Sequence, residues 1–574
     1  MRFHCRILYL GFALLAACGA RADNNFSRLL LKTEEAGKKA EFTLDRTEFV
    51  YFKTGGGADS ALTVRNAESV RRVGLTGGEG FLELPAGRWT VEGNYGDTLL
   101  LRTVPYLVYD RMCGSFDSDE MCTVTTGGWR VGMWLYNWKY LRKHILGAVN
   151  CVGWRGVPTP EIAAWREAGR KSYINYGPVH LDPEEDFVKW SKRVAEQTPT
   201  DGITLDEFVT PVRGAKKSNG EFGYDRPGHG ITPEIMKALK RFQEFCRPRG
   251  VKIFAWVGMP WNANAEDNRL LWNAAAANDD LVWWEAYCNS KEEQKGIQLR
   301  IADRFTQFRR IHPNAFRNIA ICLGTMEFSD NCAEVDFKVF LDKCLHEAAT
   351  SSVTGPIRGI GMWCSAYTDP EILLWYAALL RHYGIEGRRE MLSGSFGYKM
   401  NPGILSNPEF DRGSAGWKIS GKVEAIPLKE AAKLLKGRLG YYPRSRKNLL
   451  KMTKVSGKPN RAEAALRNLK AGSLYQVRLL VTEKEAEKRM AYPLDVTVSN
   501  AEIVERGVRQ GNDFGSGGGK QLWNYVSVIF RKSGTAPSVL TLSDRGGADD
   551  PEVLLVDAPA VTPYYMPEPV HPDR

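Results

Sequence analysis

The stretch Asp201-Gly202-Ile203-Thr204-Leu205-Asp206-Glu207-Phe208 is a short apolar run that ends in acids. Six other short apolar runs occur around it, and longer amphipathic segments separate them. This alternation predicts βα units whose strands share one parallel sheet. The expected strands cover residues 147–154, 171–177, 202–209, 251–258, 281–287, 319–326 and 357–364.

Seven βα units in a segment of roughly 260 residues match the usual size of a (β/α)8 barrel. The eighth strand is expected either around residues 104–109 or after Tyr383. A doubly wound open sheet is the alternative, but neither G-x-G-x-x-G nor G-x-x-x-x-G-K follows the first strands. We therefore expect an α/β fold with a central TIM barrel over residues 126–390.

The segments on both sides of the barrel have the pattern of β-sandwiches. Residues 23–125 hold short alternating or apolar runs separated by glycine-rich turns. Residues 391–574 lose the βα rhythm, and their runs at 405–410 and 553–556 resemble the ends of a jelly-roll carbohydrate-binding module. We expect this C-terminal domain to be jelly-roll-like, with either a sugar-binding or a purely structural role.

Composition excludes several classes of protein. Of the 574 residues, 43% are hydrophobic and 25% are charged, which argues against a disordered chain or a collagen-like fibre. No apolar run is long enough for a membrane-spanning helix.

The first 22 residues are typical of a secretory signal, because Arg2 and Arg6 precede an apolar run at residues 7–17. Cleavage is expected either after Ala22 or before Cys18, since residues 15–18 resemble a bacterial lipobox. We expect an exported protein of a Gram-negative bacterium that is periplasmic, secreted or anchored to the outer membrane. A lipid on Cys18 is the one membrane contact expected.

Nine cysteines follow the signal, and all lie between Cys113 and Cys364. An exported compartment permits disulfides, for which Cys113 with Cys122 and Cys322 with Cys332 are candidates. No spacing typical of a metal site occurs, so we expect no metal and no other cofactor.

Residues 429–470 carry a concentrated positive charge. They hold thirteen lysines and arginines against Glu430 and Glu463, a net charge of +11 that equals that of the whole chain. Such a block fits either an anionic glycan or envelope partner, or a solvated insertion without a partner. We expect no nucleic acid to bind an exported chain.

Three of the expected strands end in acids, and the active site of a (β/α)8 barrel lies at the carboxyl ends of its strands. Alternation along the first of these strands puts Thr204 and Asp206 on one face, directed into the barrel. Its large apolar residues, Ile203 and Leu205, then face the helices. Asp206 is therefore the first catalytic candidate, with Glu207 at the rim.

Glycoside hydrolysis needs two carboxyl groups across the scissile bond, one of which must be protonated. Glu285 lies beside Trp283 and Trp284, and apolar surroundings raise the pKa of a carboxyl group. We therefore expect Glu285 to be the acid/base and Asp206 the nucleophile. Glu327, at the end of a further strand, is another candidate.

The run from Asp201 to Asp206 resembles a strand of several barrel glycoside hydrolases, namely the α-amylase-like, α-galactosidase-like and polygalactosaminidase-like enzymes. In that strand an Asp-Gly pair is followed by hydrophobic residues and by a last Asp that acts as the nucleophile. The resemblance implies this role for Asp206, and for Glu285 the acid/base role of a later strand end. Chitinase-like families are similar, but their motif ends in Glu one residue further on, whereas Glu207 directly follows Asp206.

Aromatic and polar residues near the strand ends are candidates for sugar contacts. They are Trp261, Asn262, Trp283, Trp284, Tyr176, Asn175, Trp363, Tyr367 and Arg226. Arg226 lies in a long loop after Asp206 and would suit an anionic substrate.

We expect an exported glycoside hydrolase, acting by a two-carboxylate and retaining mechanism on a complex glycan of the anionic or mucin type. The alternatives are a non-catalytic surface glycan-binding protein and a structural or adhesion lipoprotein that uses the basic segment.

Overall fold

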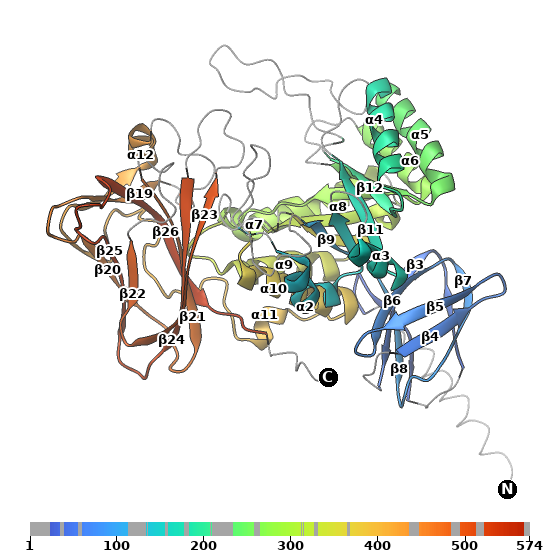
Figure 1. Ribbon diagram of the computed structural model, residues 1–574, viewed down its shortest axis with the longest axis horizontal. Coiled ribbons are helices and arrows are strands. Elements are labelled where there is room, and N and C mark those ends of the chain that lie inside the picture. The colour runs from blue at the N-terminus through green and yellow to red at the C-terminus, as the bar shows by residue number, and fades with distance from the viewer. Residues whose placement is uncertain are drawn as a thin grey trace, which may run out of the picture.

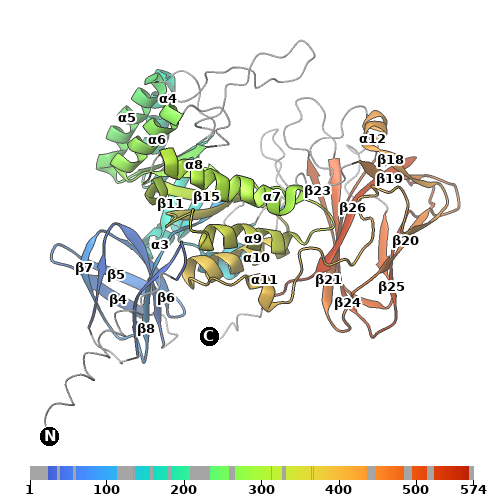
Figure 2. The ribbon, with the colours of Figure 1, turned by 180° about the vertical axis from the view of Figure 1, so that it is seen from behind.

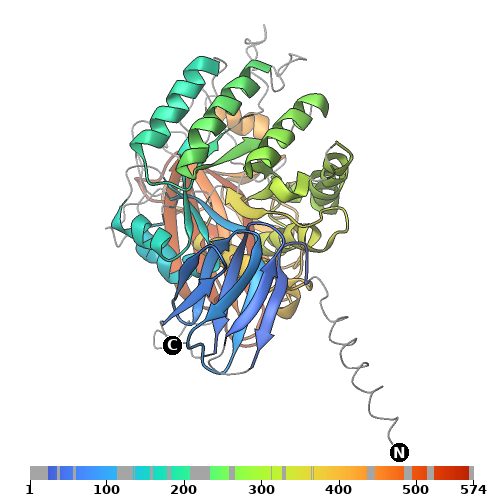
Figure 3. The ribbon, with the colours of Figure 1, turned by 90° about the vertical axis from the view of Figure 1, so that its right-hand side faces the viewer.

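The computed structural model describes residues 23–34, 39–55, 60–112, 134, 136–154, 159–176, 183–206, 208, 233–257, 265–311, 313, 315–325, 331–363, 365, 368–435, 447–483, 494–512 and 522–567. A closed barrel lies between two antiparallel β-sandwiches, which occupy opposite sides of it (Figures 1 and 2). Figure 3 shows the protein from the side of the N-terminal sandwich. Helices of the barrel lie behind this sandwich, above it and to both sides. The expected TIM barrel with a sandwich on each side is confirmed.

Eight parallel strands close the barrel in the order β10-β11-β12-β13-β14-β15-β16-β9. They are β9 (Tyr106–Met112), β10 (Cys151–Trp154), β11 (Lys171–Tyr176), β12 (Gly202–Leu205), β13 (Lys252–Val257), β14 (Leu281–Glu285), β15 (Ile319–Gly324) and β16 (Gly359–Trp363). All seven expected strands are present with shorter ends, and β9 supplies the eighth near the earlier of its two expected places. The barrel therefore begins ahead of the boundary expected at residue 126.

Helices cover the outside of the barrel. They are α2 (Trp138–His144), α3 (Pro160–Glu167), α4 (Pro183–Glu196), α5 (Pro233–Cys246), α6 (Ala265–Asn278), α7 (Glu293–Ile297), α8 (Arg304–Ile311), α9 (Phe337–Thr350), α10 (Pro370–Leu379) and α11 (Leu392–Ser395). Thr159 and Asp369 cap α3 and α10, each followed by a proline at the first helical position, which favours helix initiation. None of the helices in the described parts of the chain is both long enough and apolar enough to span a membrane.

The N-terminal sandwich packs two four-stranded sheets face to face. One contains β1 (Arg28–Thr33), β8 (Leu99–Val104), β3 (Glu48–Thr54) and β6 (Glu79–Leu84); the other contains β2 (Ala40–Leu44), β7 (Gly87–Glu92), β4 (Ser60–Arg65) and β5 (Val70–Leu75). Alternation along β3 buries Val50 and Phe52 in the sandwich core, and Phe49 and Tyr51 in the cluster shared with the barrel. The first sheet is thus buried on both faces and attaches the sandwich to the barrel.

The C-terminal sandwich has a four-stranded and a six-stranded sheet. The first contains β17 (Trp417–Ser420), β20 (Arg461–Leu466), β25 (Ser538–Ser543) and β22 (Asp495–Val498). The second contains β18 (Val423–Pro427), β19 (Asn448–Thr453), β26 (Val553–Pro563), β21 (Leu474–Glu483), β24 (Leu522–Lys532) and β23 (Ala501–Asn512), and α12 (Leu428–Leu434) connects two of its strands. Along β21, Val477 and Leu479 enter the sandwich core, whereas Arg478 and Leu480 face the barrel.

Aromatic side chains fill the inside of the barrel, and glycines on other strands make room for them. The rings of Trp256 and Trp283 are stacked, with centroids 5.4 Å apart and planes at 12°. A Cβ atom at Gly361 would lie 2.2 Å from the Trp283 ring, and one at Gly202 would lie 2.3 Å from the Phe254 ring. Gly202 therefore faces the interior, and alternation places Thr204 on the same face, as expected.

We expect Gly361→Ala to lower the free energy of unfolding by about 1–3 kcal/mol, because the added methyl group overpacks the barrel against Trp283. Denaturant unfolding measures the change. Gly507→Ala is the matched control, since its Cβ would come no closer than 4.0 Å to Ser527. Equal stability of the two variants would contradict this packing.

Glu83 of the N-terminal sandwich closes the amino end of the barrel. Its carboxylate accepts a hydrogen bond from the Tyr106 hydroxyl at 2.5 Å and lies 3.3 Å from Lys252 Nζ and 3.6 Å from Lys171 Nζ. Arg358 adds a further cation at 3.9 Å. Burial by itself would raise the pKa of Glu83, but these partners outweigh it and lower the pKa to about 2.

The sandwich–barrel contact should therefore weaken in acid. A carboxyl group whose pKa is lowered by folding adds stability above its ordinary pKa of 4.5, and this stability is lost as the pH falls toward about 2. We expect Glu83→Gln to cost about 3 kcal/mol at pH 7 and to flatten the fall in unfolding free energy between pH 4.5 and 2. Glu41→Gln, at an exposed pair with Arg88, is the control. Parallel pH curves for wild type and Glu83→Gln would rule the contribution out.

Candidate active site

Partly exposed residues lie at the carboxyl ends of the barrel strands, whereas the interior of the barrel is buried. Strands β14, β15 and β16 are buried along their length and become partly exposed only at their last residues, Glu285, Gly324 and Trp363. Asp206, directly after β12, and Tyr287, just beyond β14, are also partly exposed. These five residues form what we call the barrel mouth.

The backbone holds Asp206 at this mouth. Its strand pairs with β13 as far as Leu205 and Ala255, and the N–H of Phe208 then donates to the carbonyl of Trp256 at 2.8 Å. Asp206 thus lies between two points at which the chain is bonded to β13. Since Gly202 and Thr204 face the interior, Asp206 is the next residue of that inward row.

The phenol of Tyr287 interacts electrostatically with both predicted catalytic acids. Burial raises the pKa of Tyr287 well above its ordinary value, and the carboxylates of Glu285 and Asp206 both raise it further. Both acids therefore lie within electrostatic range of this hydroxyl. A phenol with a raised pKa keeps its proton and can donate a hydrogen bond to a carboxylate.

Tyr287 also forms an aromatic platform with Trp363. Their ring centroids are 5.4 Å apart and their planes differ by 18°, so the rings are stacked. Gly324 allows this arrangement, because a Cβ atom there would lie only 3.3 Å from the Tyr287 ring. The platform is partly exposed beside Glu285, where it can contact the apolar face of a sugar ring.

A buried hydrogen-bond network braces the strands beneath Asp206. Asp110 of β9 accepts hydrogen bonds from the Tyr173 hydroxyl at 2.7 Å and from Asn175 Nδ2 at 3.0 Å. The hydroxyl of Thr204 donates to Asn175 Oδ1 at 2.7 Å. The network links β9, β11 and β12, and it includes Thr204, one inward position below Asp206. Asn175 is therefore a buried brace, and its prediction as a substrate contact is wrong.

The prediction that Trp283 and Trp284 contact the substrate is also wrong, because both side chains are fully buried. Trp283 stacks on Trp256 inside the barrel. Trp284 points the other way and packs on Phe308 of α8, with ring centroids 4.9 Å apart. Consecutive strand residues face opposite sides, so one of the pair had to point away from the interior.

Several predicted residues lie outside the described parts of the chain: Glu207, Glu327, Trp261, Asn262, Tyr367 and Arg226. Of Tyr176, which ends β11, the backbone alone is described. Cys113 and Cys122 are also outside, whereas Cys322 and Cys332 are both free thiols, so the disulfide considered between them is not formed. No group of three or more metal-ligating side chains occurs within the described ranges.

The sequence motif that contains Asp206 begins with an acid, Asp201, whose role is structural. Asp201 lies 2.7 Å from Arg166 Nε and 3.4 Å from Lys171 Nζ, at the opposite end of β12. Tyr287 was not among the predicted site residues, although its spacing of two residues from Glu285 puts both on one face. Asp110 was not among them either, because β9 directly follows the N-terminal sandwich.

No protein-family model and no curated protein matches the sequence. The solved structures similar to it are mostly glycoside hydrolases with TIM-barrel folds. One is the catalytic module of a family 98 glycoside hydrolase from Streptococcus pneumoniae, at 8% identity over 77% of this chain and 98% of that chain, with a TM-score of 0.29. Another is a ruminal GH26 endo-β-1,4-mannanase, at 9% identity over 61% of this chain and 88% of that chain, with a TM-score of 0.25.

A third is a family 51 α-L-arabinofuranosidase from Bifidobacterium longum, at 10% identity over 69% of this chain and 88% of that chain, with a TM-score of 0.26. These similarities are too distant for any activity to be transferred from those proteins.

Proposed function

We propose that this protein is an exported glycoside hydrolase whose two catalytic carboxyl groups are those of Asp206 and Glu285. One observation carries the proposal: these acids come from different strand ends of a closed barrel, and both carboxylates act electrostatically on the same phenol, that of Tyr287. A partly exposed aromatic stack adjoins them. Glycosidic cleavage requires two carboxyl groups across the scissile bond, and an aromatic platform beside them can hold the sugar ring.

In the proposed reaction Glu285 protonates the leaving oxygen while Asp206 attacks the anomeric carbon. A glycosyl ester on Asp206 results, and a water deprotonated by Glu285 then releases the sugar with retained configuration. Trp363 holds the apolar face of the ring. The protonated Tyr287 hydroxyl orients the neighbouring carboxylates and favours the ionised state of the nucleophile.

We propose complex anionic or mucin-type glycans as the substrate class. The support is the basic segment at residues 429–470, of which the structure describes the parts before 436 and after 446. Within these parts Lys451 pairs with Glu424 at 2.8 Å, whereas Lys429, Lys433 and Lys458 show no ion pair to any described residue. An anionic glycan or the bacterial envelope fits such a surface.

A screen of aryl glycosides and mucin oligosaccharides tests the function, with wild type, Asp206→Asn and Glu285→Gln assayed in parallel. We expect the wild type to release sugar and each variant to lose that release. Undiminished turnover in both variants would overturn the site. Glycan binding without release by the wild type would instead identify a non-catalytic binding protein.

The platform gives a separate prediction for substrate affinity. We expect Trp363→Ala to raise KM about tenfold, which corresponds to about 1.4 kcal/mol of lost ring contact, with a smaller effect on kcat. Trp363→Phe keeps an aromatic face and should recover most of the loss. Initial rates over a range of substrate concentrations give both constants, and an unchanged KM in Trp363→Ala would exclude the platform.

A further inference from the structure

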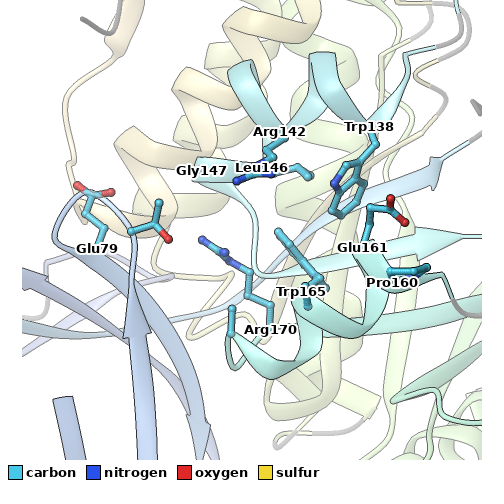
Figure 4. Close-up of a pocket in the computed structure, with 12 residues that line it drawn as sticks. Glu79, Trp138, Arg142, Leu146, Gly147, Pro160, Glu161, Trp165 and Arg170 are labelled. Carbon is cyan, nitrogen blue, oxygen red and sulfur yellow. The ribbon is translucent and has the colours of Figure 1, made fainter. Parts of the chain in front are cut away.

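A cavity of about 520 Å³ lies between the N-terminal sandwich and the barrel (Figure 4). Its walls come from the turn between β5 and β6, from α2 and from α3. Arg170, which also lines it, immediately precedes β11. The cavity is therefore at the amino end of β11, away from Asp206 and Glu285 at the carboxyl ends of the strands.

Arg170 lines this cavity and forms no ion pair with any residue that the structure describes. Its guanidinium carbon lies 4.6 Å from the ring centroid of Trp165 and 5.3 Å from that of Phe81. Nε is buried and has no hydrogen-bond partner among the residues that the structure describes. Burial lowers the pKa of Arg170 to about 10, and the nearby Glu79 offsets this only in part. Glu79 is itself engaged by Arg381 through contacts of 2.6 and 3.2 Å.

The ring contacts decide which part of Arg170 can bind a ligand. Aromatic groups beside the guanidinium leave its N–H groups as the remaining polar surface, and these present a planar fork that matches a carboxylate. Arg142 of α2 is exposed, lines the same cavity and forms no ion pair with a described residue. Figure 4 shows both guanidinium groups on one side of the cavity and Glu161 on the other.

We propose that this cavity binds a hydroxylated organic carboxylate, such as a uronic acid, with the carboxylate held between Arg170 and Arg142. Glu161 accepts hydrogen bonds from the hydroxyl groups at the opposite end. Trp138, Leu146 and Pro160 supply an apolar wall for the ring. The cavity has the volume of a small-molecule site. The site is separate from the barrel mouth and does not depend on the proposed hydrolysis.

Calorimetric titration of the full chain with glucuronate, galacturonate, glucose and sulfate tests this site at constant ionic strength. We expect at least one uronate to bind wild type and Asp206→Asn with the same Kd, and glucose not to bind. Arg170→Met keeps an unbranched stem against the rings and should weaken uronate binding at least tenfold. Arg142→Gln, a change at an exposed residue, should weaken it as well and provides the test if Arg170→Met does not fold.

Four results would overturn the proposal. The first is that neither uronate binds the wild type. The second is that Arg142→Gln and a folded Arg170→Met bind uronate as the wild type does. The third is that sulfate binds as tightly as the uronates, which would indicate unspecific attraction of anions. Loss of binding in Asp206→Asn alone would place the uronate in the barrel mouth and would also overturn it.

Discussion

Asp206→Asn is expected to lower kcat/KM for the hydrolysed glycan by about 10²- to 10⁴-fold. The amide has nearly the same volume as the carboxylate, so the barrel mouth should keep its shape, but it cannot attack the anomeric carbon. The backbone on either side of Asp206 is hydrogen-bonded to β13, so we expect it to keep its conformation in the variant. Initial-rate measurements on the substrate identified for the wild type give the ratio.

Glu285→Gln should have a different signature, because an acid catalyst matters most when the leaving group is poor. We expect a large loss on oligosaccharides and a much smaller one on aryl glycosides with an acidic phenol. Asp201→Asn is the matched control, since Asp201 directly precedes β12, at the opposite end from Asp206, and is paired with Arg166. Folded Asp201→Asn should turn over as the wild type does; a comparable loss would show that the effect of Asp206→Asn is structural.

Arg478→Met is expected to reduce the free energy of unfolding by about 3–5 kcal/mol. Arg478 of the C-terminal sandwich is 3% exposed, pairs with Asp369 at 2.8 Å and also contacts Glu371. Without it, Asp369 and Glu371 would lose a buried cation, and Lys338, which lies 3.1 Å from Glu371, is shared with Asp336 at 3.1 Å. The Tyr525 hydroxyl, which donates to Asp369 at 2.6 Å, cannot replace the lost charge.

Chemical unfolding of Arg478→Met and Arg531→Met gives a matched comparison on the same domain. Arg531 forms an exposed pair with Glu502 at 3.7 Å, and such pairs contribute at most about 1 kcal/mol. Similar small losses in both variants would show that the buried network does not hold the domains together.

The barrel could be predicted because its pattern is local. Along β12, Ile203 and Leu205 are large and apolar while Thr204 and Asp206 are polar, so the pleat alone assigns the inward face. The same rule puts Trp283 and Trp284 on opposite faces of their strand but does not say which of them points into the barrel. That depends on Gly361, on a different strand, which leaves room for the Trp283 ring inside the barrel.

Other features depend on contacts between distant parts of the chain. Only Pro105 separates β8 of the sandwich from β9 of the barrel, so no change of composition marks the domain boundary. Glu83 and Arg478 are ordinary charged residues in the sequence. Their importance comes from the cations and carboxylates that the barrel places opposite them. The cavity at Arg170 likewise exists only where two domains meet.

Covalent labelling tests the roles of the two acids most directly. The protein would be incubated with an activated 2-deoxy-2-fluoro glycoside of the sugar that the wild type releases, and the digested peptides would be analysed by mass spectrometry. A single sugar adduct is expected on the peptide that contains Asp206, with none in Asp206→Asn. An adduct on a different carboxyl group, or full hydrolysis of the glycan by Asp206→Asn, would contradict the assignment.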